Sequence, residues 1–197
     1  MPRNLEFDVD AARAAIMREF WLRGYESTSL SDLERATMLV RTSLYNAFGN
    51  KPDMFLNSLE LYYETVEHEI DAATKDRGAE ALADVIAAMM TGTDKQAGQP
   101  AGCLMVSAAT QNAALDDRHL MLVRDYRRML ARKARDVLER DRSAGKLAQT
   151  FDTESASEFL VCVVWGALAA QCLQNAKTPA AAGAKVMRQT IESWFTT

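Results

Sequence analysis

Apolar residues recur at spacings of three and four along most of the chain, and capping residues separate the segments that carry this pattern. In the first such segment Ala12, Ile16 and Phe20 lie on one stripe, with aspartates before it and Gly24 after it. This spacing is typical of amphipathic helices, and no alternating β-branched run bounded by hairpin turns occurs in the sequence. The chain is therefore predicted to be all-α.

Capping signals set the expected bounds of about nine helices. Ser29 with Asp32 forms a capping box, Gly49 is placed to end a helix, and Pro52 lies in the first turn of the next. The predicted helices run over about 8–23, 29–37, 41–48, 50–74, 79–91, 102–114, 117–143, 153–176 and 179–195. The long fourth helix is expected to connect two domains, residues 1–52 and 53–197.

The predicted third helix, residues 41–48, has two different faces. Leu44 and Phe48 share one face, which can pack on the two preceding helices, whereas the opposite face is polar and aromatic. Two short helices joined by a three-residue turn and backed by a third have the geometry of a helix-turn-helix, whose second helix enters the major groove of DNA. The expected DNA contacts are Arg41, Thr42, Ser43, Tyr45 and Asn46 on this helix, with Thr28, Ser29 and Lys51 placed to hold phosphates.

Residues 20–55, FWLRGYESTSLSDLERATMLVRTSLYNAFGNKPDMF, carry a more specific pattern. It combines a Gly-Tyr turn, Thr-Ser before the second helix, and Leu-Tyr-x-x-Phe-x-x-Lys from the third helix into the fourth. These residues, Gly24, Tyr25, Thr28, Ser29, Leu44, Tyr45, Phe48 and Lys51, make the stretch resemble the N-terminal domain of TetR/AcrR-family transcriptional regulators. Met38 and Val40 depart from that pattern, in which glycine and a capping serine or glycine are common at the turn.

The resemblance implies an all-α homodimer with an N-terminal three-helix helix-turn-helix domain and a C-terminal helical ligand-binding and dimerisation domain. A small molecule bound by the second domain would release operator DNA from the first. Methionine and aromatic side chains are numerous in the C-terminal helices, where they can form either an ordinary core or the wall of an apolar or aromatic effector site. The expected ligand contacts are Leu59, Tyr62, Tyr63, Val66, Met89, Met90, Cys103, Tyr126, Met129 and Trp165.

A homodimer is also indicated by residues 159–170, which are apolar around the full circumference of their helix. One side of such a helix can face its own domain, but the other side would be exposed in a monomer. The predicted dimer interface consists of Phe159, Val163, Leu168, Ile191, Trp194 and Phe195.

Cysteine and histidine usage does not indicate a metal, cofactor or disulfide framework. The three cysteines lack C-x-x-C spacing, and the two histidines lie far apart in the sequence. Cys103, at a helix start, is expected to be a buried structural cysteine, with a sensor of oxidants or electrophiles as the alternative. Cys162 and Cys172 are also expected to be buried structural cysteines. His68 and His119 are expected on helix surfaces. No base lies in a motif with a nucleophile, so no enzyme is expected.

Composition and charge narrow the functional classes. A chain of 197 residues that is 48% apolar can form a core without staples. It begins without a signal-peptide h-region, and its longest apolar run is shorter than the roughly 18 residues of a membrane span, so a cytoplasmic protein without a membrane segment is expected.

The net charge is −4, and residues 1–52 carry seven basic and seven acidic side chains. DNA binding therefore has to depend on placed contacts rather than on a broad basic surface. Two functions remain. One is a ligand-responsive repressor that binds a palindromic operator as a homodimer. The other is a helical small-molecule-binding or interaction protein that has lost DNA binding.

Overall fold

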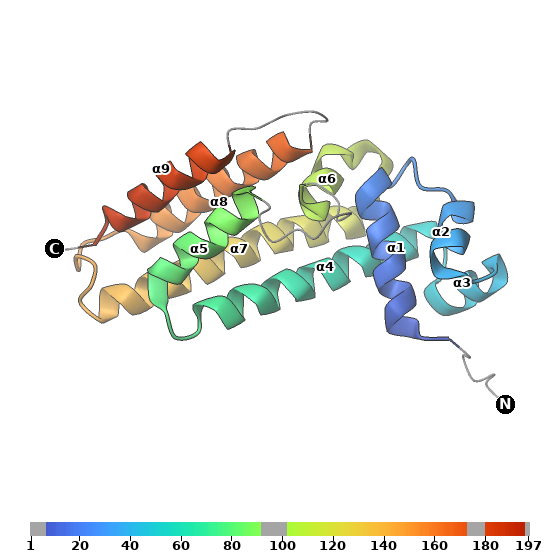
Figure 1. The fold of residues 1–197 in the computed structure, drawn as a ribbon, viewed down its shortest axis with the longest axis horizontal. Coiled ribbons are helices and arrows are strands. Elements are labelled where there is room, and N and C mark those ends of the chain that lie inside the picture. Colours follow the sequence, from blue (N-terminus) through green and yellow to red (C-terminus); the bar gives the residue numbers. More distant parts are fainter. Residues whose placement is uncertain (1–6, 92–101, 173–179, 196–197) are drawn as a thin grey trace. The chain divides into compact units, whose positions relative to one another are not determined.

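The structure is a computed structural model that describes residues 7–91, 102–172 and 180–195. All regular elements in these ranges are helices, so the prediction of an all-α fold is confirmed (Figure 1). In chain order they are α1 (Val9–Arg23), α2 (Leu30–Thr37), α3 (Arg41–Phe48), α4 (Lys51–Thr74), α5 (Gly78–Thr91), α6 (Leu104–Thr110), a 3-10 turn (Asn112–Ala114), α7 (Asp117–Ser143), α8 (Thr153–Gln171) and α9 (Ala180–Glu192). A single isolated β-bridge pairs Leu147 with Phe195.

The first five helices and α7 have the predicted bounds to within one residue, whereas α6 is shorter than expected. It ends at Thr110, because the N–H of Gln111 lies 3.2 Å from the carbonyl oxygens of both Ser107 and Ala108. A donor shared in this way tightens the last turn into 3-10 geometry. α9 ends at Glu192 rather than at residue 195, and the predicted end of α8, residues 173–176, lies outside the described residues.

The chain divides into two compact units. The first comprises residues 1–64 and 104–123, and the second comprises residues 65–103 and 124–197. α4 and α7 each contribute residues to both units. The first compact unit thus includes α6 and the first part of α4 together with the N-terminal helices. The predicted boundary between a DNA-binding domain, residues 1–52, and a ligand-binding domain, residues 53–197, stays a prediction.

The first unit is held by the predicted apolar stripes. Ala12, Ile16 and Phe20 of α1 are all buried, and α2 packs against this helix. Leu33 of α2 and Leu44 of α3 are completely buried. Because helices of eight residues are marginal in water, tertiary burial of these leucines is what stabilises α2 and α3.

In the second unit α5 packs against both α9 and α8 (Figure 1). The N-terminus of α5 is capped by a distant side chain, since the buried carboxylate of Asp141 on α7 accepts the N–H of Ala79 at 2.7 Å. Gly78 has φ 65°, and a Cβ atom there would lie 2.6 Å from that carboxylate. Position 78 therefore needs glycine both for its conformation and for space.

α8 is the one helix among the described residues that is long and apolar enough to cross a membrane by length and composition. Seven of its residues are buried, and the helix packs on α5 within the second unit. The core helix of a folded protein passes the same test of length and composition, so α8 is weak evidence for a membrane span.

Candidate functional site

The connection between α2 and α3 combines one strong cap with two unusual positions. The predicted capping box is confirmed, because Ser29 Oγ accepts the N–H of Asp32 (3.2 Å) and Asp32 Oδ2 accepts the N–H of Ser29 (2.9 Å). Hydrogen bonds from the Ser29 hydroxyl and then from its N–H lower the pKa of Asp32 to about 2. α2 ends at Met38, which has φ 58°, and Val40 is the N-cap of α3 without a side-chain hydrogen bond.

α3 presents its polar face to solvent. Leu44 and Phe48 are buried on the opposite face, while the exposed residues are Arg41, Thr42, Tyr45 and Asn46. Ser43 is half-buried. Arg41 lies 3.3 Å from Glu34 of α2, and the exposure of the arginine side chain makes this a weak ion pair. The structure thus brings four of the five predicted α3 residues together on one exposed face, and their contact with DNA stays a prediction.

All three predicted phosphate contacts have partners within the protein, and the Ser29 hydroxyl donates to Asp32 Oδ2 at 2.6 Å. Thr28 is completely buried, and its hydroxyl donates to the carbonyl oxygen of Gly24 at 2.7 Å, so the prediction that this side chain meets phosphate is wrong. Lys51 is half-buried: its Nζ lies 3.4 Å from the carbonyl oxygen of Glu26 and 4.7 Å from the ring centroid of Tyr25. Burial lowers the pKa of Lys51.

The side chain of Gln111, just after α6, braces the turn that follows α1. Its Oε1 accepts the N–H of Tyr25 (3.2 Å), and its Nε2 donates to Ser107 Oγ (3.2 Å). Gly24, with φ 81°, lies directly beneath this amide, and a Cβ atom there would be 2.7 Å from Gln111 Nε2. α6 is therefore fastened to the N-terminal helices by a side chain that carried no signal in the sequence.

His119 holds the first turns of α4 and α7 together. The prediction that it lies on a helix surface is wrong, because it is buried, with Nε2 2.9 Å from the carbonyl oxygen of Pro52 and Nδ1 2.7 Å from Asp116 Oδ1. Arg118 adds ion pairs to Asp116 (3.0 Å) and Asp53 (3.1 Å). The hydrogen bond from Arg118 is the main cause that lowers the pKa of Asp116 to about 2.

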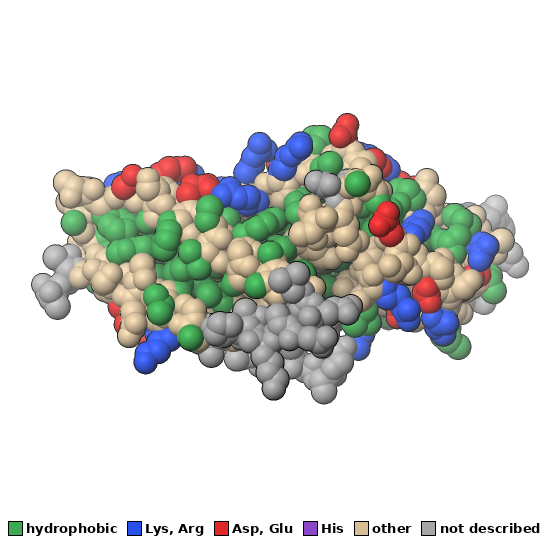
Figure 2. Space-filling model, turned by 90° about the horizontal axis from the view of Figure 1, so that it is seen from above, with side chains coloured by type: hydrophobic (Ala, Val, Ile, Leu, Met, Phe, Trp, Pro, Cys, Tyr) green, Lys and Arg blue, Asp and Glu red, His purple; other side chains and the backbone are tan. Residues whose placement is uncertain are grey.

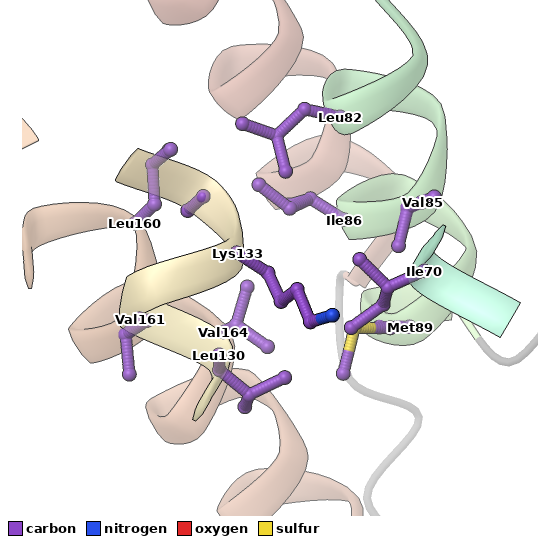
Figure 3. A pocket seen from close by; sticks show the side chains of 11 residues that line it. Ile70, Leu82, Val85, Ile86, Met89, Leu130, Lys133, Leu160, Val161 and Val164 are labelled. Carbon is purple, nitrogen blue, oxygen red and sulfur yellow. The ribbon is translucent and has the colours of Figure 1, made fainter. Parts of the chain in front are cut away.

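A small apolar cavity lies in the second unit (Figure 3). Its volume is about 30 Å³, and it is lined by Ile70, Leu82, Val85, Ile86, Met89, Leu130, Lys133, Ala134, Leu160, Val161 and Val164. Lys133 is the one charged residue in this lining and reaches toward Ile70 and Met89 (Figure 3). Its Nζ is paired with Asp71 (2.6 Å) and Glu67 (3.2 Å). Drug-sized ligands need pockets of about 300–1,000 Å³, so an effector would have to enlarge this space.

Of the predicted ligand contacts, only Met89 lines this cavity. Cys103, Tyr126 and Met129 are completely buried, with Cys103 Sγ 4.0 Å from Tyr126 Oη. Met90 is also buried, and Val66 and Trp165 are half-buried. The remaining three, Leu59, Tyr62 and Tyr63, belong to the first unit, where Tyr62 packs edge-on against Trp21. The spacing of residues in the sequence could not distinguish side chains that fill the core from side chains that line a cavity. The burial of Cys103 agrees with a structural cysteine.

The predicted dimer residues divide into exposed and buried sets. Phe159 is 47% exposed, whereas Leu168 and Ile191 are buried within their own unit and cannot offer surface to a partner, contrary to the prediction. The prediction that Cys162 is a buried structural cysteine is wrong, because it is exposed on α8, and Cys172 is half-buried.

Val163, Trp194 and Phe195 are half-buried. Trp194 packs on Phe151 with ring centroids 5.3 Å apart, and Val186 of α9 is 61% exposed. Figure 2 shows hydrophobic side chains gathered over the part of the surface where α8 and α9 lie.

Comparisons with known proteins connect this geometry to a family. Residues 12–57 match the family model described as bacterial regulatory proteins of the tetR family. The chain is 33% identical over 172 residues to the HTH-type transcriptional repressor ComR of Escherichia coli, which covers 81% of this chain and 77% of that protein. It is 41% identical over 64 residues to YezE, an uncharacterized HTH-type transcriptional regulator of Bacillus subtilis, over 32% of this chain and 33% of that protein.

Solved structures agree with this match. A cysteine mutant of the TetR-family regulator CifR, bound to 26 bp double-strand operator DNA, superposes with a TM-score of 0.75 at 26% identity, over 98% of this chain and 99% of that one. NemR of Escherichia coli in its reduced form gives a TM-score of 0.78 at 18% identity, over 96% and 97% of the two chains, which shows the fold alone.

Proposed function

Because the chain belongs to the TetR family of transcriptional regulators, we propose that it is a cytoplasmic repressor that binds a palindromic operator as a homodimer and releases it when a small apolar effector binds. It is a DNA-binding regulator rather than an enzyme. The name of the relative ComR supports repression, and the operator complex of CifR supports double-stranded DNA as the partner.

The exposed face of α3 is the observation that carries this proposal. Arg41, Tyr45 and Asn46 are exposed on the side opposite the two residues that bury the helix, so this face can enter the major groove. Arg can pair with guanine and Asn with adenine, while Thr42 and Tyr45 can contact a thymine methyl group or phosphate. Half-buried Ser43 is left at the edge of this face.

Phosphate contacts position the protein on DNA. Ser29 at the start of α2 and Lys51 at the start of α4 remain the candidates, since both lie at helix N-termini of the first unit. Replacing Lys51 with alanine is expected to weaken binding to all sequences alike and to reduce the slope of log affinity against log salt by about one. The matched control is Arg124→Ala, which removes an exposed arginine of α7.

The dimer is proposed to form through α8 and α9. The exposed side chains of Phe159 and Val186, with half-buried Val163, Trp194 and Phe195, provide apolar surface that a second copy would cover. A two-fold axis would repeat α3 at a separation of about one turn of DNA or a multiple of it, which explains why a palindromic operator is expected.

Effector binding is proposed to act through α4. Ile70 of this helix lines the cavity in the second unit, and Lys51 begins the same helix in the first unit. An effector that enlarges the cavity displaces Ile70, and a continuous helix transmits that displacement. Linkage then requires that operator DNA weaken effector binding by the same factor as effector weakens DNA binding.

Selection of DNA from a random pool tests the proposal. Enrichment of a palindrome by the wild-type protein is expected. If no sequence were enriched while the protein stayed folded and bound apolar compounds, the chain would be a helical binding protein that has lost DNA recognition, the other function that the neutral charge of residues 1–52 suggests.

The effector is tested separately. Apolar and aromatic compounds that raise the melting temperature are titrated into the protein–operator complex, and at least one is expected to weaken it. Leu82→Phe and Val161→Phe, which fill the cavity, should abolish the thermal shift without changing operator affinity. Compounds that stabilise the protein by several degrees yet never alter operator affinity would refute the coupling.

A further inference from the structure

Met38 and Val40 are the most exposed large hydrophobic side chains among the described residues. Met38 is 88% exposed and Val40 is 65% exposed. Both lie in the three-residue connection that leads into α3, and Val40 is the residue directly before its first turn. Apolar side chains at such exposure contribute nothing to the core of the first unit.

Local stability does not account for these two residues either. Met38 adopts φ 58°, a left-handed conformation that glycine takes without a steric penalty and that is uncommon for other residues. Val40 occupies an N-cap without supplying a side-chain hydrogen bond, whereas serine there would cap the helix. Met38 and Val40 thus depart from the usual residue preferences for a left-handed conformation and for an N-cap. Such departures concentrate at functional sites.

The position of the pair identifies its partner. The N-terminal residues of a recognition helix are the ones that contact base edges, and Val40 and Met38 extend that end of α3. In the major groove the apolar group on a base edge is the C5-methyl of thymine. The other exposed residues of α3 are Arg41, Thr42, Tyr45 and Asn46, so the apolar pair complements a face that otherwise offers hydrogen bonds.

We propose that Met38 and Val40 are specificity-determining residues that contact thymine methyl groups in each operator half-site. The inference rests on the proposed function, since it requires α3 to lie in the major groove. It adds thymine contacts from the connection before α3 to those that Thr42 and Tyr45 can make from the helix itself.

Replacement of single thymines by deoxyuridine tests the inference without changing the protein. Uracil keeps every base-pairing group and loses only the methyl. In the palindrome selected by the wild-type protein, at least one symmetric pair of thymines is expected at which each deoxyuridine weakens binding about fourfold, the effect of leaving one methyl group unburied. Fluorescence anisotropy at fixed salt measures the affinities.

The protein side of the test uses Val40→Ser and Met38→Gly. Both variants should unfold at a higher temperature than wild type, because serine caps α3 and glycine relieves the left-handed residue. Their operator affinity should nevertheless fall, and the deoxyuridine effect should shrink to less than 1.5-fold at the thymine that each residue contacts. Met121→Ala, at a methionine of α7 that is 58% exposed, is the matched control and should keep the full fourfold effect.

The results distinguish a failure of the proposed function from a failure of the thymine contacts alone. Failure to enrich any palindrome would overturn both the proposed function and this inference. A palindrome that tolerates deoxyuridine at every position, or a deoxyuridine effect that persists in both Val40→Ser and Met38→Gly, would overturn the inference and leave DNA binding by α3 intact.

Discussion

Replacing Asp141 with alanine is expected to destabilise the protein by about 2 kcal/mol, within a range of about 1–3 kcal/mol for a buried donor left without its acceptor. Asp141 is 4% exposed, and its Oδ2 is the acceptor for the first-turn N–H of Ala79 at 2.7 Å. Its Oδ1 also accepts from Lys146 Nζ at 3.0 Å, but the lysine side chain is 55% exposed, so this ion pair contributes little. The loss should therefore come almost entirely from the buried N–H of Ala79 at the start of α5, which is left without its acceptor.

Thermal unfolding followed by circular dichroism measures this loss. For a chain of this length about 2 kcal/mol corresponds to a decrease of about 4–8 °C in the melting temperature. Asp141→Asn is the matched control, because its amide oxygen can still accept the N–H of Ala79 while the charge is removed. It should lose less than half as much as alanine. An alanine variant that melts within 1 °C of wild type, or an asparagine variant as unstable as alanine, would refute the capping role.

The remaining predictions concern the loss of stability at low pH, the hydrogen bond from Tyr25 to Gln111, and the dimer interface. The pKa values of Asp32 and Asp116 are about 2 in the folded protein, below the usual value of about 3.9, so both groups stabilise the fold above pH 4 and lose this contribution as pH falls toward 2. The urea midpoint should fall over that range, and a midpoint independent of pH would contradict the assignment. Gln111→Ala should lower the melting temperature by leaving the Tyr25 N–H without its acceptor, whereas Gln111→Glu should retain most of the stability; equal losses would contradict this. Phe159→Asp should yield a folded monomer by light scattering, and a dimer of unchanged strength would place the interface elsewhere.

The helices could be predicted from sequence because their signals are local. Periodic apolar residues and caps lie within a turn of the bounds that they set, as the Asp8 cap of α1 and the Ser29–Asp32 box of α2 illustrate. The end of α6 could not be predicted in this way. No cap marks this end, where the backbone N–H of Gln111 is shared between the carbonyl oxygens of Ser107 and Ala108. The side chain of Gln111 then bonds to Tyr25 across 86 residues.

The sequence predicted the exposed residues of α3 correctly, because helical periodicity determines which side of that helix is exposed. It failed for residues whose burial depends on tertiary contacts. The polar face of α3 follows from the burial of Leu44 and Phe48 on the other side. A threonine hydroxyl before a helix can point outward or bond backward, and in Thr28 it bonds to Gly24. His68 is exposed as expected, but no local pattern indicates that His119 is enclosed by residues of α4.

The affinity of the Asn46→Ala variant for the selected palindrome tests most directly the claim that α3 reads DNA. Asn46 is exposed, so its removal leaves the fold intact, and circular dichroism verifies this for each preparation. Loss of one base contact should weaken binding by about 1–3 kcal/mol, roughly 5- to 150-fold, and should relax the preference at one base position in each half-site. Operator affinity unchanged within twofold, with every base preference retained, would contradict the assignment of α3 as the recognition helix.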